Sequence, residues 1–218
     1  MWLTPSTYIS GMVPENTDTR PYHHGDLRAA LLATALDLLR ARGPAGLTLR
    51  GVARAAGVSR TAPYRHFQDR RELVAAVAAA AFGRMGRAIG QAVQEGSPGL
   101  PALRRGLAAY IAFAEAHPAE YRVMFGPEVA GRDGLPELEG AALGVFDILR
   151  GGIARLQQRG LLGEGDAGTM AIAAWATLHG LSMLSLDGQT AVTGRGIEAL
   201  TEEATELLLR GMGAPARE

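Results

Sequence analysis

Apolar residues recur every three or four positions along most of this chain, which is the spacing of one face of an α-helix. The first such stripe predicts a helix over 24–42, and Gly43 and Pro44 are expected to end it. Further stripes predict a short helix around Tyr121 and long helices over 69–94, 99–116, 136–159, 166–186 and 194–212. No segment alternates apolar and polar residues as a strand would. With two short helices between 48 and 66, we therefore expect an all-α protein of about nine helices.

Glycine and proline modify this pattern in three places. Gly151 and Gly152 fall inside the stripe over 136–159, where they predict a kink or a break. Residues 126–135 contain glycine and proline without periodicity, so we expect a loop there. Residues 1–20 also lack periodicity, and we interpret them as a loose tail.

The stretch 47–73 holds two short apolar segments joined by a tight turn at Gly57. Thr48 is a favourable N-cap for the first segment, and Ser59 begins a second segment that runs to about residue 66. Two short helices joined by a glycine-containing turn are typical of a helix-turn-helix. The second helix of this unit can lie in the major groove of DNA.

Pro63 lies inside the second of these segments. It cannot donate the hydrogen bond that the Ser59 carbonyl would accept, and its ring crowds that carbonyl. Because the proline is close to the start, we expect the helix to persist with a distorted first turn. Directly afterwards, Asp69 and Glu72 have the spacing of a capping box that opens the long helix over 69–94.

Charge is unevenly distributed, although the net charge of the whole chain is zero. Every basic residue is an arginine; residues 20–72 carry a net charge of +6, and residues 73–218 carry −4. A basic module on an acidic body is typical of a protein whose one end meets a polyanion. A merely solvated basic face is the simpler explanation. The excess coincides with the helix-turn-helix, however, which favours double-stranded DNA as a partner.

The stretch 47–73 resembles the DNA-binding core of the TetR (tetracycline-repressor-like) family. The residues that match are Thr48-Leu49, Val52-Ala53, Ala56-Gly57-Val58-Ser59, Tyr64-Arg65-His66-Phe67 and Leu73. Residues 22–27 are also similar to the start of the first helix in one subgroup. Members of that subgroup often carry a Trp-x-x-x-His-Gly element in the C-terminal domain, and Trp175, His179 and Gly180 supply it here.

This resemblance implies a helix-turn-helix DNA-binding domain over 21–84 and an effector-binding and dimerisation domain over 85–218. The DNA contacts that it implies, together with our candidates for base readout, are Thr48, Arg50, Ser59, Arg60, Thr61, Pro63, Tyr64, His66 and Arg70. Tyr64 and His66 resemble phosphate contacts, whereas Phe67 is expected in the core. Arg60 and Thr61 are our candidates for base readout, because arginine can bond guanine through two acceptors.

The chain departs from the family pattern at three of these positions. Gly51 stands where an acid is usual, so the first short helix lacks part of its cap. Pro63 replaces the commoner leucine and is expected to alter which base edges the second helix reaches. Arg70 replaces the commoner lysine but keeps a cation at a helix N-terminus, where a phosphate is expected to bind.

One helix-turn-helix reads only a few base pairs, so we expect a homodimer on a palindromic operator. The resemblance implies that the last two helices form the interface, and small residues on 166–186 would permit close approach of the backbones. The residues predicted for this interface are Ala171, Ala174, Leu178, Gly180, Leu181, Leu200, Ala204, Leu207 and Leu208.

Aromatic and methionine residues of the C-terminal helices are candidates for an effector pocket. They are Phe113, Tyr121, Met124, Phe125, Phe146, Trp175, His179 and Met183. Such residues at helical spacing are more often plain core, and His179 is also explained as a buried, hydrogen-bonded histidine. Family members commonly enclose an apolar effector here, whose binding changes the spacing of the two DNA-reading heads. No particular ligand is indicated by the sequence.

Other chemistries find little support. The chain has no cysteine, and its five histidines lack metal-ligand spacing. Residues 163–168 match GxGxxG, but they follow a predicted helix rather than a strand, so no dinucleotide site is expected. No secretory signal and no uninterrupted apolar run of membrane-spanning length is evident. We expect a cytoplasmic protein without cofactor, metal, catalytic residues or membrane partner.

Two classes of function remain. The first is a sequence-specific DNA-binding transcriptional regulator, a repressor by family expectation, that a small apolar effector releases. The second is a helical small-molecule-binding or enzymatic protein in which the helix-turn-helix is vestigial. The presence of Tyr64, His66 and the local positive charge favours the first.

Overall fold

The computed structural model describes residues 27–131 and 134–214, and within them the chain is helical throughout. The eight α-helices are α1 (Leu27–Arg42), α2 (Leu49–Ala55), α3 (Arg70–Gln94), α4 (Leu100–Ala116), α5 (Pro118–Met124), α6 (Pro136–Gln158), α7 (Ala167–Leu186) and α8 (Ile197–Gly211). Four short 3₁₀ turns connect them: η1 (Pro44–Gly46), η2 (Ala62–Arg65), η3 (Pro127–Val129) and η4 (Gln189–Thr193). The all-α prediction is confirmed. The predicted tail over 1–20 and the helix start at residue 24 lie outside the described residues.

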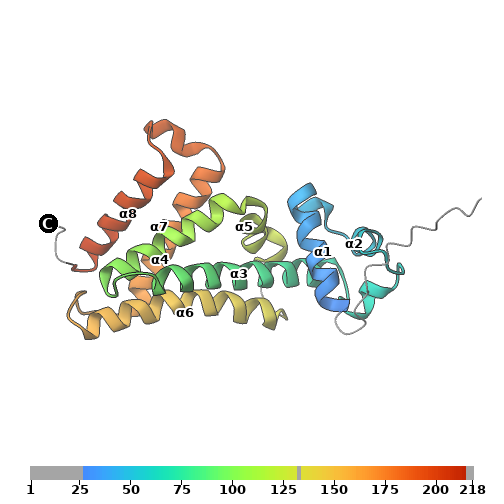
Figure 1. Ribbon diagram of the computed structural model, residues 1–218, viewed down its shortest axis with the longest axis horizontal. Helices are drawn as coiled ribbons and strands as arrows, with labels where there is room; N and C mark the ends of the chain where they lie inside the picture. Colours follow the sequence, from blue (N-terminus) through green and yellow to red (C-terminus); the bar gives the residue numbers. More distant parts are fainter. Residues whose placement is uncertain (1–26, 132–133, 215–218) are drawn as a thin grey trace, which may run out of the picture.

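The helices α1 and α2 and the turn η2 form a small unit at one end of the molecule (Figure 1). The stripe predicted on α1 faces inward, with Leu31, Ala35 and Leu39 fully buried. Thr48 caps α2 as expected, because its Oγ1 accepts a hydrogen bond from the Gly51 amide at 3.0 Å. The Cβ of a side chain at position 51 would lie only 2.8 Å from this Thr48 oxygen. The glycine that replaces the usual acid therefore leaves room for the cap.

The long helix α3 joins this small unit to the body of the protein. Asp69 caps its start by accepting from the Glu72 amide at 2.9 Å, and the Glu72 carboxylate accepts from the Gln68 amide at 2.6 Å. The reciprocal cap predicted at this point is therefore present, with its return bond one residue earlier than expected. The predicted domain boundary at residue 84 falls in the middle of α3, so a continuous helix rather than a linker connects the two parts.

The body packs around α3, which α4 and α6 flank on opposite sides along its length (Figure 1). The short α5 lies at the end of the body that meets α1, whereas α8 lies toward the opposite end (Figure 1). Leu73, Val77, Phe82, Met85 and Ile89 of α3 are buried in one continuous apolar core. Both parts of the molecule are therefore packed against the same helix.

The prediction of a second short α-helix over 59–66 is wrong. Only the 3₁₀ turn η2 forms there, and the Ser59 carbonyl accepts from the Ala62 amide at 3.0 Å instead of from a residue four positions on. Pro63 has no amide hydrogen to donate to that carbonyl, and its ring occupies the space that the α-helical path would need. In so short a segment, the loss of this one bond is enough to change the helix type.

Three other boundaries differ from the predictions. The α6 helix is unbroken from Pro136 to Gln158, because its packing along α3 offsets the cost of about 1 kcal/mol for each glycine of the Gly151–Gly152 pair. The loop predicted over 126–135 contains the turn η3. The last helix begins at Ile197 rather than at residue 194, and η4 precedes it.

Two helices, α3 and α7, are long and apolar enough to span a membrane by length and composition, each with a mean hydropathy of 1.3. In α3, 61% of the apolar stretch is buried within the protein, so its composition is that of a core helix. In α7 only 22% is buried, which leaves much of an apolar helix at the surface of the single chain. Neither helix is evidence for a membrane, and the exposed face of α7 is considered below.

Candidate functional site

The small N-terminal unit exposes several arginines that have no carboxylate partner among the described residues. They are Arg42, Arg50, Arg54, Arg60 and Arg65. Because no acid neutralises these cations, the unit keeps the positive potential that its sequence indicated. A surface of this kind suits the phosphate backbone of DNA.

The predicted DNA-contact residues mostly lie at the surface of this unit. Thr48, Arg50, Ser59, Arg60 and Thr61 are exposed, and Tyr64 leaves 50% of its surface in solvent. The hydroxyls of Ser59 and Thr61 lie 3.3 Å apart, and His66 is half-buried. These residues are brought together on α2, η2 and the turn between them.

Pro63 does not belong with them, which corrects the prediction that it reaches a base. The ring is buried inside the N-terminal unit, where the turn η2 closes over Phe67. Its carbonyl accepts from the amides of His66 and Phe67 at 3.0 and 2.9 Å. Pro63 therefore anchors the turn from within.

Arg70 has a structural environment that the sequence did not indicate. Its guanidinium donates to the carbonyl oxygens of Leu47 and Pro44, both at 2.9 Å, and lies 3.4 Å from the Glu128 carboxylate. These bonds tie η1 and η3 to the start of α3. A phosphate at this position would have to draw Arg70 away from these partners, so the predicted phosphate contact stays a prediction.

A cavity of about 580 Å³ lies in the body between α3, α4, α6 and α7. This volume is within the range of roughly 300–1,000 Å³ that is typical of small-molecule sites. At the end nearer α5, the wall is aromatic and consists of Phe82, Tyr110, Phe125, Phe146 and Trp175. Leucine, isoleucine and valine side chains line most of the remainder, so the cavity suits an apolar ligand.

Three of the predicted pocket residues line this cavity: Phe125, Phe146 and Trp175. The other five, which are Phe113, Tyr121, Met124, His179 and Met183, do not line it. Phe113, Tyr121 and Met124 are buried but lie outside the cavity wall. Helical spacing predicts which face of a helix is buried, but it does not predict whether a side chain on that face reaches the cavity. Phe82 and Tyr110 were missed, although each also lies on an apolar stripe.

A chain of hydrogen bonds runs from the cavity wall to α5. The Trp175 indole donates to the Tyr110 hydroxyl at 3.1 Å, that hydroxyl lies 3.0 Å from the Tyr121 hydroxyl, and Tyr121 lies 2.8 Å from His179 Nδ1. Because an indole can only donate, the chain is satisfied when each hydroxyl donates onward and His179 accepts. His179 is then neutral, with its hydrogen on Nε2.

Burial keeps this chain uncharged. It raises the pKa of Tyr121 to about 12 and raises that of Tyr110 further, with the neighbouring Tyr121 adding to the Tyr110 shift. Burial also lowers the pKa of His179. A protonated His179 would have to donate to Tyr121, which would reverse the bonds and leave a tyrosine hydrogen unplaced.

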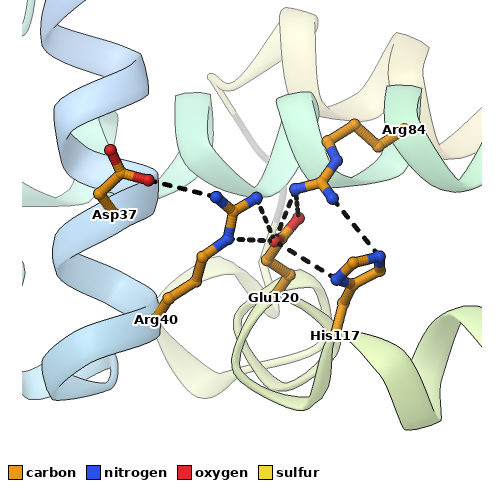
Figure 2. Close-up of polar contacts among 5 residues, drawn as sticks. All are labelled: Asp37, Arg40, Arg84, His117 and Glu120. Atoms are coloured by element: carbon orange, nitrogen blue, oxygen red, sulfur yellow. Dashed lines mark hydrogen bonds and ion pairs between the residues drawn. The ribbon is translucent and has the colours of Figure 1, made fainter.

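On α5, one residue before Tyr121, Glu120 is only 1% exposed and holds the two parts of the molecule together (Figure 2). Its Oε1 accepts from Arg40 Nε of α1 at 3.0 Å, and both of its oxygens lie 2.6 Å from Arg84 Nη1 of α3. Arg40 also bonds Asp37, at 3.2 Å. Two arginines from different parts of the chain thus share one buried carboxylate.

His117 completes this cluster. Arg84 Nη2 lies 3.4 Å from its Nε2, and its Nδ1 faces the Glu120 carboxylate at 4.0 Å (Figure 2). Desolvation, and then the positive charge of Arg84, lower the pKa of His117. A neutral ring that accepts from Arg84 agrees with this direction. None of this cluster was singled out from the sequence, because no local pattern connects its members.

The exposed face of α7 differs from the interface that was predicted. Ala171, Ala174 and Leu178 are buried inside the single chain, and Leu178 lines the cavity, so these three are corrected to core positions. The outward face carries Ala176, Gly180 and Leu184 at intervals of four residues, and Leu184 is about half exposed. Ile172 is also about half exposed, but it lines the cavity. On α8, Leu207 is 71% exposed, whereas Leu200, Ala204 and Leu208, like Leu181 of α7, are half-buried.

Comparisons with known proteins match both parts of the chain. Residues 31–77 match a family model described as bacterial regulatory proteins, tetR family, and residues 103–208 match one described as tetracyclin repressor-like, C-terminal domain. No curated protein matches the chain. The subgroup with the Trp-x-x-x-His-Gly element stays a prediction.

Solved structures share the fold over most of the chain. A protein of unknown function from Rhodococcus sp. RHA1 is 35% identical, with a TM-score of 0.78 over 88% of this chain and 98% of its own. A bacterial regulatory protein in the tetR family, from Rhodococcus RHA1, is 19% identical, with a TM-score of 0.66 over 86% and 97%. The transcriptional regulator FadR from Bacillus subtilis, in complex with stearoyl-CoA, is 16% identical, with a TM-score of 0.68 over 84% and 98%. The last two likenesses concern the fold alone.

The two half-buried histidines, His117 and His179, predict how stability depends on pH. Their pKa values lie below the ordinary 6.5 in the folded protein, so the unfolded chain binds more protons as the pH falls through 6.5. The free energy of unfolding should therefore fall between pH 7.5 and 5.5. The double variant His117→Gln/His179→Gln should show a smaller fall in urea unfolding at the two pH values. An unchanged fall would show that these histidines do not carry the effect.

Proposed function

Because this chain belongs to the TetR family of bacterial regulatory proteins, we propose that it is a transcriptional repressor that binds a palindromic operator as a homodimer and is released by a small apolar effector. Regulators of this family are generally not enzymes, and we place the protein in the cytoplasm, where its DNA would be. The observation that carries the proposal is the basic surface of the helix-turn-helix unit, whose arginines have no acidic partner among the described residues. This unit packs against α3, which also forms part of the cavity wall.

The basic surface supports DNA binding in two ways. Arg50, Arg54 and Arg65 offer cations to phosphates without first having to leave an acidic partner among the described residues. Arg60 and Thr61 precede η2 and are exposed, where base edges are within reach of side chains from a groove-bound turn. Footprinting on the DNA that flanks its own gene tests this directly, since a protected palindrome is expected.

The outward face of α7 supports a homodimer. An apolar stripe at four-residue intervals, with Gly180 at its middle, is a surface against which a second helix packs closely. A side-chain carbon at Gly180 would meet nothing within 4 Å in the single chain, so the space above it is open. We infer that α7 and α8 of a second copy cover this face, and that Leu184 and Leu207 lie in the interface.

The cavity supports an apolar effector. Its wall is mostly aliphatic and aromatic, and Tyr110 and Trp175 contribute the few polar atoms at the end near α5. The similar FadR from Bacillus subtilis was solved with stearoyl-CoA, a ligand with a long apolar chain. An effector of that general character is therefore our proposal for this cavity.

The position of α5 suggests how the cavity communicates with the DNA-binding unit. Tyr121 is two hydrogen bonds from Trp175 in the cavity wall, and the residue before it, Glu120, bonds Arg40 of α1. Both contacts belong to one helix of seven residues. A ligand that displaces Tyr110 or Phe125 would shift α5 and so change the position of α1, provided that it binds the shifted state more tightly.

The first prediction concerns DNA recognition. Tyr64→Ala should weaken binding to all operator variants alike, because a phosphate contact carries no sequence information. Arg60→Ala should reduce the preference at one base pair by about 1–3 kcal/mol. Gel-shift titrations against a series of mutated operators measure both effects. If Arg60→Ala weakened every operator equally, its base-reading role would be excluded. If the wild-type protein bound no operator DNA even at low salt, where phosphate contacts are strongest, DNA binding would be refuted.

The second prediction concerns assembly. Leu184→Glu should convert the dimer to a monomer, because it places a charge in an apolar interface that would desolvate it. Sedimentation velocity measures the change, and circular dichroism confirms that the fold persists. Val192→Glu is the control, since Val192 is 84% exposed on η4, outside both the cavity wall and the stripe of α7. Loss of the dimer with the control alone would assign the interface to the surface around η4.

The third prediction concerns coupling. Arg40→Gln should leave operator affinity nearly unchanged but reduce several-fold the factor by which a cavity ligand weakens it, since couplings of this kind are typically about 1–3 kcal/mol. Decanol serves as an apolar probe in fluorescence-anisotropy titrations of labelled operator.

Arg28→Gln is the matched control, because Arg28 of α1 pairs at 2.5 Å with Glu137 of α6 rather than with the carboxylate of α5. The proposal requires that Arg28→Gln reduce the effect of the ligand on operator affinity less than Arg40→Gln does. If both variants reduced that effect equally, any contact between the N-terminal unit and the body could transmit it, and α5 would have no special role.

A further inference from the structure

The cavity is elongated, and its two ends differ in chemistry. Along α3 it extends from Phe82 to Gln94, a span of about 18 Å at 1.5 Å per residue. Phe82, Phe125 and Trp175 close the end near α5. A narrow apolar space of this length fits an extended chain better than a compact ring system.

The opposite end of the cavity is cationic. Arg155, in the last turn of α6, and Arg159, which caps the C-terminus of that helix, both line it there. Among the described residues neither arginine has a carboxylate partner, in contrast to Arg150 on the same helix, which pairs with Asp147 at 2.9 Å. In the part of the chain that the structure describes, no acidic side chain belongs to the cavity wall. Two unpaired cations at the mouth of an apolar space are the arrangement expected for a ligand with an anionic head.

The loop beside these arginines is held by a third arginine. Arg105 donates to the Ala92 carbonyl at 2.9 Å and to the Ser97 carbonyl at 2.8 Å, across the turn that joins α3 to α4. This turn contributes Gly96, Pro98 and Gly99 to the cavity wall. The mouth is therefore built from a fixed turn on one side and two unpaired guanidinium groups on the other.

We propose that the cavity binds an amphiphile with an extended apolar tail and an anionic head, the tail reaching the aromatic end and the head lying against Arg155 and Arg159. This inference rests on the proposed function only in taking the cavity as the effector site, and it names the chemical class of that effector. A carboxylate and the phosphate of a conjugated head both fit two guanidinium groups. A tail that reaches Phe125 and Trp175 touches the wall from which the hydrogen-bond chain leads to α5.

The aromatic end allows a rival ligand class. Several rings around one space attract a quaternary ammonium group by cation–π contacts. A cationic ligand would, however, have to pass Arg155 and Arg159 to reach those rings, and the wall offers no carboxylate to compensate. The observations therefore favour the anionic amphiphile, and the cationic one is an outcome of the test.

A larger side chain at position 152 would fill the cavity without displacing its other wall residues. Gly152 lines the cavity on α6, and a Cβ placed there would meet no atom within 4 Å. Gly152→Leu should therefore fold normally, with a side chain that occupies the space of the tail. It also replaces a glycine inside a helix, which favours the helix by up to about 1 kcal/mol and so guards against unfolding as an explanation.

The experiment measures binding to the full chain by tryptophan fluorescence. The chain has two tryptophans, so Trp2→Phe leaves Trp175 in the cavity wall as the only reporter. The probes are dodecanoate, dodecanoyl-coenzyme A, dodecanol and dodecyltrimethylammonium. Dodecanoate or its coenzyme A thioester should bind about tenfold more tightly than dodecanol, and this advantage should decrease as salt is added. The two anionic probes distinguish a free acid from a conjugated phosphate-bearing head.

Three variants test which part of the cavity each portion of the probe occupies. Arg155→Gln/Arg159→Gln should remove the tenfold advantage of the anionic probe and leave dodecanol unchanged. Arg150→Gln removes one charge from the same helix outside the cavity and should change neither probe. Gly152→Leu should abolish binding of every probe while the far-ultraviolet circular dichroism spectrum is retained.

Three results would overturn the inference: equal binding of dodecanoate and dodecanol, an anion preference that survives the double arginine variant, or tighter binding of the ammonium probe. The proposed function is tested independently of this inference, because operator binding is measured without any ligand. A chain that binds dodecanoate through these arginines but protects no DNA would keep the inference and refute the repressor.

Discussion

One carboxylate governs how the two parts of this molecule are joined. Glu120 is almost completely buried, and removing a charge from water costs several kcal/mol unless partners compensate for it. Arg40 and Arg84 supply that compensation from α1 and α3, so the carboxylate is stabilised only while both helices stay where they are. The orientation of the DNA-binding unit relative to the body is therefore constrained by electrostatics at one point as well as by the continuous helix α3.

The helix that carries Glu120 also carries the inner end of a neutral hydrogen-bond network. Tyr110, Tyr121 and His179 satisfy one another and the Trp175 indole, and burial shifts each of their pKa values so that the uncharged form is favoured. A charged cluster and a neutral chain thus meet on adjacent residues of α5. In the charged cluster and in the neutral chain, one arrangement satisfies all of the hydrogen bonds. Packed elements of this kind change between discrete states rather than deforming gradually.

Local patterns in the sequence predicted the features that depend on neighbouring residues. The caps at Thr48 and Asp69 and the inward stripe of α1 all follow from spacings of four residues or fewer, and all are present. Features that depend on distant partners could not be found in this way. Glu120 is 80 residues from Arg40 and 36 from Arg84, and the carbonyls that bind Arg70 are 23 and 26 residues away.

The misplaced residues show the same limit. Ala171, Ala174 and Leu178 share one face of α7, as their spacing indicated, but spacing does not tell which neighbour that face meets. The cavity lies on that side, and our proposal assigns the stripe of Ala176, Gly180 and Leu184 to a second copy. Tyr121 was placed in the cavity wall for its aromatic ring, yet its hydroxyl draws it one layer deeper, toward His179.

The turn η2 has a consequence for how this protein would read DNA. It spans only four residues, which at about 2.0 Å per residue is close to 8 Å, far shorter than the helix that usually fills the groove. Pro63 is buried and fixes the turn. Arg60 and Thr61 precede the turn, Tyr64 lies within it, and all three are exposed. Few side chains can then meet base edges in each half-site, so phosphate contacts must supply most of the affinity. The arginines of the N-terminal unit that have no acidic partner among the described residues can supply such contacts, and the proposed dimer would double their number.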